Sequence, residues 1–341
     1  MRAAVLHEPG PPEAFSIEEL PVPRPANDEV LVEVAACGVS YRDIVERNGT
    51  YRRDVRYPLI IGLEIAGTVR ELGTAVRRLK VGDRVCSKAF SSCGACRLCR
   101  TGRETTCASR QPVRGGYGEY VALPEDAFCV LPESVSFEIA CSLGPAAGVA
   151  LNAVRDVARV TIGDTVLVTG ASGGVGHAAM QLAKRSGARV IAATRDESKR
   201  LALLDAGADE VVPLGTRTGF SRRVLDLTDG AGVDVVIDNV GSRVFDACFD
   251  ALARHGRYAM VGQLFGEDVS INPARIFFKR AQLLGVGSVS RAQLDDAIRL
   301  AAAGQLTIMI AARVPLAEVA QAHRWVEEGG VIGRVVLTMR E

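Results

Sequence analysis

The chain has 341 residues, of which 41 are basic and 40 acidic, and its formal net charge is +1. Charges of the two signs are interspersed, which argues against a nucleic-acid stripe or a basic membrane-binding helix and favours a small-molecule partner. No stretch approaches 18 uninterrupted apolar residues, so we expect no membrane span and a cytoplasmic location. The length allows two domains, and 35 glycines with repeated Val and Ile runs indicate an α/β enzyme.

The first third of the sequence has the pattern of an irregular β-rich domain. Short β-branched or alternating runs are separated by Gly and Pro, which is typical of strands joined by turns. The expected strands cover residues 29–36, 65–72, 84–87 and 120–122.

Four cysteines crowd one segment of this domain: Cys93, Cys96, Cys99 and Cys107. Glycines between them loosen the turns, so that four thiolates can converge tetrahedrally on one zinc ion. Two disulfides are the alternative. However, the odd total of nine cysteines and the absence of a recognisable secretory signal fit a reducing compartment. The spacing therefore predicts one structural zinc in a lobe over residues 90–110.

Beyond Leu131 the pattern changes, and apolar strands alternate with alanine-rich helical stretches. Apolar runs without alternation are typical of parallel strands covered on both faces, so this region predicts a doubly wound parallel sheet. A helix over 293–303 and a strand over 331–339 follow, and these could return to the first domain. The expected strands of the sheet are 164–169, 189–194, 233–238 and 258–262, with helices at 176–186 and 198–206.

A glycine-rich loop joins the first of these strands to its helix. The segment 169–176 reads TGASGGVG, with Ala171 where the usual dinucleotide fingerprint has glycine. Small residues there let the backbone approach a pyrophosphate at the helix N-terminus, which predicts dinucleotide binding. The predicted cofactor-binding residues are Ala171, Ser172, Gly173, Gly174, Val175, Gly176, Thr194, Arg195, Lys199, Asn239 and Gly262.

The end of the next strand bears on the choice of nicotinamide cofactor. An NAD site usually places an acid there, about 20 residues after the loop, to bind the ribose 2′-hydroxyl. This chain has Thr194 at that place, followed by Arg195, with Lys199 and Arg200 after it. Lys199 and Arg200 also fit an ordinary solvated helix face, partly offset by neighbouring acids. The local positive charge favours a 2′-phosphate, so we predict NADPH.

Taken together, these motifs resemble the medium-chain dehydrogenase/reductase superfamily over essentially the whole chain. The residues that carry the resemblance, besides the cysteine lobe and the glycine loop, are CGVSYRD at 37–43, GLEIAGTV at 62–69 and VGDRV at 81–85. Tyr41-Arg42-Asp43 and the later Tyr57-Pro58 look most like the acryloyl-CoA reductase branch, near the quinone and enoyl reductases.

The resemblance implies a domain plan. It implies a GroES-like catalytic domain over 1–131, a Rossmann domain over 132–284, and a C-terminal segment, 285–341, that returns to the catalytic domain, with the active site in the cleft. It also implies a homodimer formed through the edge of the Rossmann sheet, where residues 269–271 and 283–289 supply apolar strand-like material.

The sequence departs from the superfamily pattern at the catalytic zinc. Zinc-dependent members hold that metal with a Cys at the position of Ser40 and a His at the position of Leu63. A leucine cannot ligate zinc, and Glu64 with a nearby thiol does not make the open site that alkoxide activation needs. Cys37 lies three residues too early and reads as a buried structural thiol. We therefore expect no catalytic zinc.

Without that Lewis acid, the resemblance favours NADPH-dependent reduction of an activated C=C bond in an enoyl thioester, enone or quinone. Tyr51 matches the tyrosine proton donor of the related mitochondrial enoyl reductases, and Tyr41 is the second candidate; each also fits a half-buried packing ring. The alternatives are a metal-independent alcohol or carbonyl dehydrogenase and a non-catalytic NADPH-binding module. The cluster Arg52, Arg53 and Arg56 could meet a CoA phosphate, although surface arginines are usually just solvated.

Overall fold

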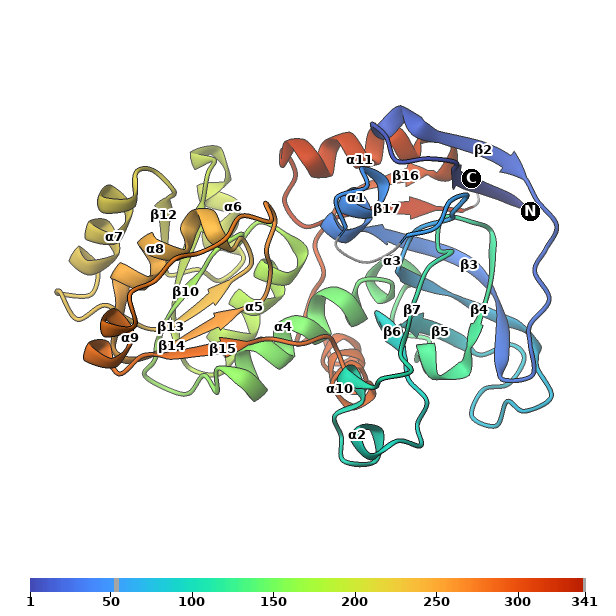
Figure 1. Cartoon of the computed structure of the whole chain (residues 1–341), viewed down its shortest axis with the longest axis horizontal. Coiled ribbons are helices and arrows are strands. Elements are labelled where there is room, and N and C mark those ends of the chain that lie inside the picture. Colours follow the sequence, from blue (N-terminus) through green and yellow to red (C-terminus); the bar gives the residue numbers. More distant parts are fainter. Residues whose placement is uncertain (52–54, 340–341) are drawn as a thin grey trace. The chain divides into compact units, whose positions relative to one another are not determined.

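The computed structural model describes residues 1–51 and 55–339, which divide into two compact units (Figure 1). Unit 1 combines residues 1–148 with residues 288–341, and unit 2 is the continuous stretch 149–287. The first boundary thus falls after Gly148, later than the predicted boundary after Leu131. The reason is packing: helix α3 (Phe137–Ala140) contacts strands β3 to β5, and the turn of helix η4 (Leu143–Gly148) contacts β5 and helix α10 (Arg291–Ala302), all in unit 1.

Unit 1 is built on a seven-stranded sheet whose longest strand comes from the N-terminal part of the chain and whose neighbour comes from the C-terminal end. Along the main path the order is β16-β17-β3-β4-β5-β9, and β8 also pairs with β3. Strand β17 lies antiparallel to β3, with Leu337 opposite Cys37, so the C-terminal segment does return to this unit (Figure 1). The strands are β3 (Glu29–Val39), β4 (Glu64–Leu72), β5 (Arg84–Ser87), β8 (Tyr120–Pro124), β9 (Phe128–Val130), β16 (Ile310–Pro315) and β17 (Arg334–Thr338).

Short elements surround this sheet and position the candidate site. Helix α1 follows β3 directly, and helix α11 contacts α1, β3 and β17. Two small antiparallel pairs, β1 with β2 and β6 with β7, complete the unit. The bounds are β1 (Arg2–Leu6), β2 (Phe15–Glu19), α1 (Tyr41–Arg47), β6 (Phe90–Ser91), α2 (Arg97–Arg100), β7 (Gln111–Pro112) and α11 (Val319–Glu328).

Unit 2 is a six-stranded parallel sheet in the order β12-β11-β10-β13-β14-β15. By chain position within the unit this is the order 3-2-1-4-5-6, the arrangement of a doubly wound dinucleotide-binding fold. The strands are β10 (Thr165–Val168), β11 (Arg189–Thr194), β12 (Glu210–Pro213), β13 (Val233–Asp238), β14 (Leu252–Met260) and β15 (Gln282–Gly285). The helices are α4 (Val149–Leu151), η5 (Asn152–Val157), α5 (Gly174–Arg185), α6 (Arg200–Asp205), α7 (Arg217–Asp226), α8 (Ser242–Ala251) and α9 (Pro273–Lys279).

Burial explains why the central strands of unit 2 read as continuous apolar runs. Val166, Leu167 and Val168 of β10 are completely buried, as are consecutive residues of β13. Helices therefore cover both faces of the sheet, and the predicted fold class, a β-rich domain with a doubly wound parallel sheet, is confirmed. None of the helices among the described residues has the length and apolar character to cross a membrane.

Several predicted bounds were wrong in detail; the strand expected over 258–262, for example, is β14 (Leu252–Met260). The helix expected from Gly176 begins at Gly174, because glycines that read as loop residues already form the first turn of α5. Residues 269–271 form no strand, and the edge strand β15 spans only Gln282–Gly285.

Candidate functional site

The glycine loop of unit 2 packs tightly against the first turn of α5. Gly170 has φ +58°, a conformation that favours glycine. A Cβ on Gly176 would lie 2.2 Å from the carbonyl oxygen of Gly170, so only glycine fits where the helix meets the loop. Ala171 is buried while Gly173 is exposed. The loop therefore leaves backbone uncovered at the N-terminus of a 12-residue helix, the arrangement that suits a pyrophosphate.

The carboxyl ends of β10, β13 and β14 bring further predicted residues to this edge. The Asn239 side chain, just after β13, donates from Nδ2 to the carbonyl oxygen of Thr169 at 2.8 Å. Its Oδ1 is buried and has no hydrogen-bond partner among the described residues. A Cβ on Gly262, after β14, would lie 2.7 Å from the Asn239 carbonyl oxygen. Strand order reverses between β10 and β13, which is where dinucleotides bind in such sheets.

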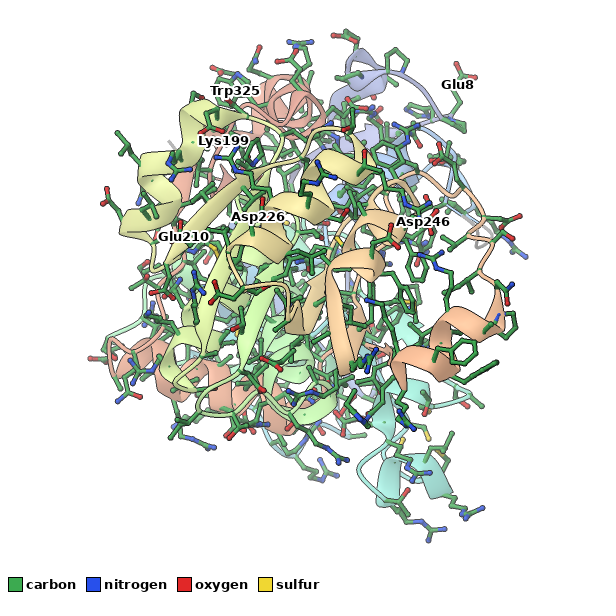
Figure 2. All side chains as sticks on the ribbon, turned by 90° about the vertical axis from the view of Figure 1, so that its left-hand side faces the viewer. Glu8, Lys199, Glu210, Asp226, Asp246 and Trp325 are labelled. Atoms are coloured by element: carbon green, nitrogen blue, oxygen red, sulfur yellow. The ribbon has the colours of Figure 1, made fainter. Side chains whose placement is uncertain are left out.

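The segment after β11 presents one exposed cation. Thr194 Oγ1 accepts from the Asp196 backbone N–H at 3.1 Å, and Asp196 Oδ1 accepts from the Ser198 N–H and hydroxyl. These bonds from Ser198 lower the pKa of Asp196. Arg195 is exposed, whereas Lys199, which lies just before α6 and is labelled in Figure 2, is only 5% exposed, and burial lowers its pKa.

Arg200 turns away from this place, because its Nη1 donates to the Val211 carbonyl oxygen of β12 at 2.8 Å. Of the three basic residues that the sequence singled out here, Arg195 is thus the exposed one, and no hydrogen bond or ion pair holds its side chain within residues 1–51 and 55–339.

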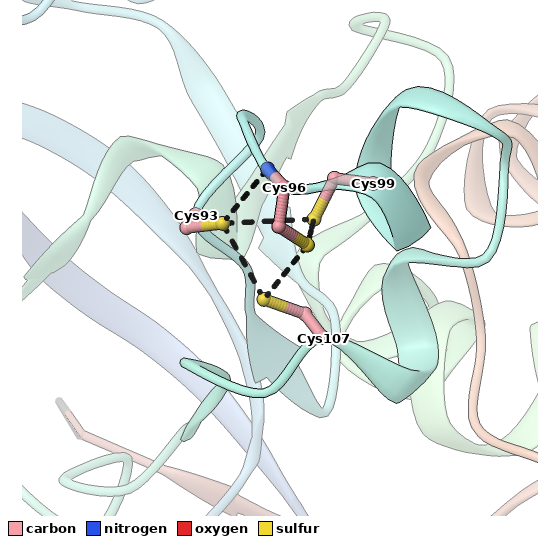
Figure 3. A group of neighbouring side chains, drawn as sticks. All are labelled: Cys93, Cys96, Cys99 and Cys107. Atoms are coloured by element: carbon pink, nitrogen blue, oxygen red, sulfur yellow. Dashed lines mark hydrogen bonds between the residues drawn. The ribbon is translucent and has the colours of Figure 1, made fainter.

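The four cysteines of the lobe converge as the spacing predicted (Figure 3). Adjacent Sγ atoms lie 3.5 to 3.9 Å apart, and all four lie within 4.8 Å of one another. Four thiolates at the usual Zn–S distance of about 2.3 Å stand about 3.8 Å apart, so the geometry fits a tetrahedral zinc. Backbone N–H groups of Ala95 and Cys96 lower the pKa of Cys93 to about 6, which favours a thiolate. The cluster can hold a metal ion of this kind.

A buried lysine attaches the lobe to the sheet of unit 1. The Lys88 side chain is 2% exposed, and its Nζ lies 3.2 Å from Glu104 of the lobe and 2.9 Å from Asp126. Glu104 also accepts from the backbone N–H of Arg291 at the start of α10. Glu104 therefore joins the lobe to two partners in the rest of the unit, and Asp126 adds a second link by accepting from the Ser92 N–H and hydroxyl.

The start of α1 holds a fully buried carboxylate. Asp43 Oδ2 accepts from the Ser40 N–H at 2.8 Å and from the Ser40 hydroxyl at 2.6 Å, which caps the helix. Its Oδ1 has no partner among the described residues. Burial raises the pKa of Asp43 to about 7, and the charges of Glu46 and Glu64 add to the effect against the bonds from Ser40. The hydroxyl of Ser40 is thus committed to Asp43.

Next to this cap, Glu64 is completely buried and fully paired. Its Oε1 lies 2.6 Å from Arg334 Nη2, and its Oε2 accepts from the Ser142 hydroxyl at 2.7 Å. Cys37 is buried as well, and burial raises its pKa well above the usual thiol value. Glu64 therefore reads as a structural counter-ion to Arg334.

These residues do not fit a catalytic zinc. Leu63 is a hydrocarbon side chain, 4% exposed, the Ser40 hydroxyl serves Asp43, and both oxygens of Glu64 are occupied. In the part of the chain that the structure describes, the lobe cysteines are the one group of three or more His, Cys, Asp or Glu residues arranged for a metal. We derive no step through a metal at this place.

The two candidate tyrosines lie at opposite ends of α1. Tyr41 is its first residue, and Tyr51 follows it, held by a backbone bond to Val45 and by the Arg42 guanidinium 5.4 Å from the ring centre. Both rings are partly buried, and neither hydroxyl has a hydrogen-bond partner within 1–51 and 55–339. Of the three arginines predicted to meet a CoA phosphate, Arg56 is exposed. The other two, Arg52 and Arg53, lie outside the described residues.

Sequence reasoning missed the buried polar contacts of this unit. Arg334 reaches Glu64 across 270 positions, and no local pattern marks such a pair. Arg47 of α1, only 2% exposed, donates to His323 Nδ1 at 3.2 Å, and His323 Nε2 lies 2.9 Å from the Tyr117 hydroxyl. No apolar pattern in α1 marks Arg47 as buried, because the other buried residues of this helix include Asp43 and Glu46.

Both units of the chain match families of known proteins. Residues 26–133 match the model of an alcohol dehydrogenase GroES-like domain, and residues 174–303 match that of a zinc-binding dehydrogenase. Acryloyl-coenzyme A reductase of Sulfurisphaera tokodaii is 31% identical over 342 residues, 99% of either chain. The crystal structure of AibC is 40% identical and covers 100% of this chain and 96% of that chain, with a TM-score of 0.92. The structure of an NAD-dependent alcohol dehydrogenase is 34% identical over the whole of both chains, with a TM-score of 0.93.

Proposed function

This chain belongs to the medium-chain dehydrogenase/reductase superfamily, and from that premise we propose that it is an NADPH-dependent reductase of an activated C=C bond. One observation carries the proposal: the positions that hold the catalytic metal in zinc-dependent members contain Leu63 and a Ser40 hydroxyl bound to Asp43. Alcohol oxidation needs help to lower the pKa of the hydroxyl group, and these residues offer none. The reductase name of the Sulfurisphaera tokodaii relative supports the same direction.

Reduction of an activated alkene places smaller demands on the protein. NADPH, when bound, supplies a hydride to the β-carbon of an α,β-unsaturated carbonyl, and the π electrons move to the carbonyl oxygen to give an enolate. The protein then has to stabilise that oxygen with hydrogen-bond donors and to deliver a proton to the α-carbon. A tyrosine hydroxyl is a suitable donor, and Tyr51 and Tyr41 both have hydroxyls free of partners among the described residues.

The choice of NADPH is supported by residues of this chain rather than by its relatives, one of which is named for NAD. Thr194 stands where an NAD site usually has an acid, and Asp196 is engaged by Ser198. Arg195 is exposed and its guanidinium suits a phosphate group. We assign it to the ribose 2′-phosphate, with Lys199 in a lesser role because its side chain is largely buried.

Three further features belong to the proposal. We assign one structural zinc to the lobe cysteines, because their Sγ separations suit a tetrahedral ion. We propose a homodimer joined at the β15 edge, where the neighbouring helix α9 exposes Phe277 and Phe278. A reducing, cytoplasmic setting accords with nine cysteines among which the structure forms no disulfide.

The direct test mixes the purified protein with NADPH and a panel of enones, quinones and enoyl thioesters. Alkene reduction consumes NADPH and yields a saturated carbonyl compound, which is the expected result. An allylic alcohol as the product would instead identify a carbonyl reductase. NADPH binding seen by fluorescence, without loss of its absorbance on any substrate, would identify a binding module.

Replacement of Tyr51 by Phe tests the proton donor. If Tyr51 protonates the enolate, Tyr51→Phe keeps the ring contact with Arg42 and the NADPH affinity, while kcat falls by a factor of about 10²–10⁴. The measurement is steady-state kinetics on the best alkene, with NADPH affinity from fluorescence titration. Tyr41→Phe is the matched comparison. An unimpaired Tyr51→Phe beside an impaired Tyr41→Phe would move the role to Tyr41, and two unimpaired variants would leave water as the donor.

A further inference from the structure

Two arginines of unit 1 share one buried carboxylate. Arg42 of α1 donates from Nε and Nη2 to Glu46 Oε1, both at 3.0 Å. Arg114, just after β7, donates from Nη2 to the same oxygen at 3.2 Å and from Nε to Oε2 at 3.3 Å. The Glu46 side chain is 1% exposed, so this negative charge is enclosed by the two guanidinium groups. Glu46 can neutralise only one of them.

A third arginine joins them through an aromatic ring. The guanidinium of Arg110 lies 4.8 Å from the ring centre of Phe90, and that of Arg42 lies 5.3 Å from the same ring. The one hydrogen bond of the Arg110 side chain within the described residues goes to the Thr105 carbonyl oxygen, which carries no net charge. The arginine cluster, defined here as Arg42, Arg110 and Arg114, therefore carries three positive charges against one negative charge.

The cluster is held in place and still has unused donors. Contacts with Phe90, Tyr51 and Glu46 fix Arg42, whose side chain is 15% exposed, while that of Arg114 is 22% exposed. Within residues 1–51 and 55–339, Nη1 of Arg42 and of Arg114, and Nε and Nη2 of Arg110, have no hydrogen-bond partner. Fixed, planar guanidinium groups with spare N–H donors match the oxygens of a phosphate or carboxylate. A solvated surface arginine is not held in this way.

We propose that the arginine cluster is a binding site for an anionic group, phosphate or carboxylate, carried by the substrate. This inference rests on the proposed reductase function and deepens it, because Arg42 belongs to the cluster and also contacts the ring of Tyr51, the candidate proton donor. The anion has two possible sources that share this chemistry. One is the phosphate-bearing tail of a thioester carrier, and the other is a carboxylate on the unsaturated molecule itself.

Matched substrate pairs distinguish the two sources. Crotonyl-CoA and crotonyl-pantetheine share the acyl group and the thioester but differ in phosphates, and 4-oxo-2-pentenoate and its methyl ester differ in one carboxylate. We expect kcat/KM to favour the anionic member of one pair by about tenfold or more, chiefly through KM, and the ratio to fall toward one in Arg110→Gln. Arg110 is the chosen position because it has no carboxylate partner, so its loss leaves no buried acid unpaired. Arg100→Gln, an exposed arginine of the lobe, is the control and keeps the wild-type ratios.

Ratios near one for both pairs in the wild type, or ratios that Arg110→Gln leaves unaltered, would overturn the arginine site while leaving the reductase intact. A binding measurement tests the arginine site even if the protein proves not to be a reductase. Calorimetric titration of NADPH-loaded protein with free CoA, and with the saturated acid 4-oxopentanoate, does not depend on turnover. If no substrate is reduced but Arg110→Gln weakens one of these ligands about tenfold, the site stands and the proposed function fails. Equal binding to both proteins, with no reduction, overturns both.

Discussion

Asp43 is the carboxylate of this chain whose titration has the clearest consequence for stability. Its pKa is about 7 in the folded protein against an ordinary 3.8, because it is fully buried. Between these values the unfolded chain releases the proton while the folded chain keeps it. The free energy of unfolding therefore falls as pH rises through this window, and the loss is complete above pH 7.

Asp43→Asn removes this titration and retains an oxygen that accepts from Ser40. We compare the free energy of unfolding of the variant with that of the wild type. From pH 5 to pH 8 this difference should shift by about 3 kcal/mol in favour of the variant, measured by urea unfolding at both pH values. His323 gives the opposite slope in acid, because burial lowers its pKa to about 3. The contribution of Asp43 is therefore isolated by the difference in the free energy of unfolding between the variant and the wild type. A difference that stays constant with pH would contradict the burial of an ionisable Asp43.

Arg195 sets the expected cofactor preference. Arg195→Ala removes the exposed guanidinium assigned to the 2′-phosphate and should weaken NADPH binding by about 1–3 kcal/mol, with little effect on NADH. Fluorescence titration with both cofactors measures this. Arg185→Ala, an exposed arginine in the last turn of α5, is the control for lost surface charge. Wild-type protein that uses NADH as well as NADPH would refute the assignment.

At the scale of elements, the zinc lobe and its attachment can be tested separately. We expect one zinc per chain by elemental analysis, with Cys99→Ser losing the metal and unfolding the lobe. Glu104→Gln should keep the zinc but weaken the attachment through Lys88, lowering the free energy of unfolding by about 1–3 kcal/mol. Two tightly held zinc ions per chain would show that a second metal site exists. Loss of zinc from Glu104→Gln would show that zinc binding depends on the attachment of the lobe to the rest of unit 1.

Elements with a strong apolar pattern could be predicted from the sequence almost to the residue. The bounds expected for β5, β11 and β13 match the structure, because each is a short buried run between turn residues. The start of α5 was predicted two residues too late, because Gly174 reads as a loop residue in the sequence and is already helical in the structure. The converging cysteines followed from spacing alone.

The polar interior of unit 1 could not be predicted in the same way. The pairing of Glu64 with Arg334 depends on β4 and β17 both lying beside β3, which is a property of the assembled sheet. The arginine cluster likewise combines Arg42 of α1 with Arg110 and Arg114, which flank β7 and are distant from α1 in sequence. The roles given to Tyr51, Tyr41 and the cofactor residues stay predictions.

At the scale of the whole molecule, the exposed apolar side chains of α9 lead to a prediction about assembly. Phe277 and Phe278 are 60% and 72% exposed on α9, which contacts β14 and directly precedes the edge strand β15 in the chain. If this edge joins two copies, Phe278→Glu should convert a dimer to a monomer, because a charge cannot be buried there without a partner. Sedimentation velocity compares the two proteins, with Leu201→Glu, at another exposed apolar residue, as the control. A monomeric wild type would rule out the edge as the interface.

The pairing of β17 with β3 has a consequence for biosynthesis. Unit 2 is one uninterrupted stretch, so a nascent chain can fold it as soon as residues 149–287 have left the ribosome. Unit 1 is different, because β3 is synthesised long before its partner β17, which comes from residues 334–338. The C-terminal part of β3 must therefore wait, with an unpaired edge, until residues 334–338 have been synthesised. A stop codon placed before Arg334 would thus spare the cofactor unit and leave the sheet that carries Cys37 and Ser40 without its last partner.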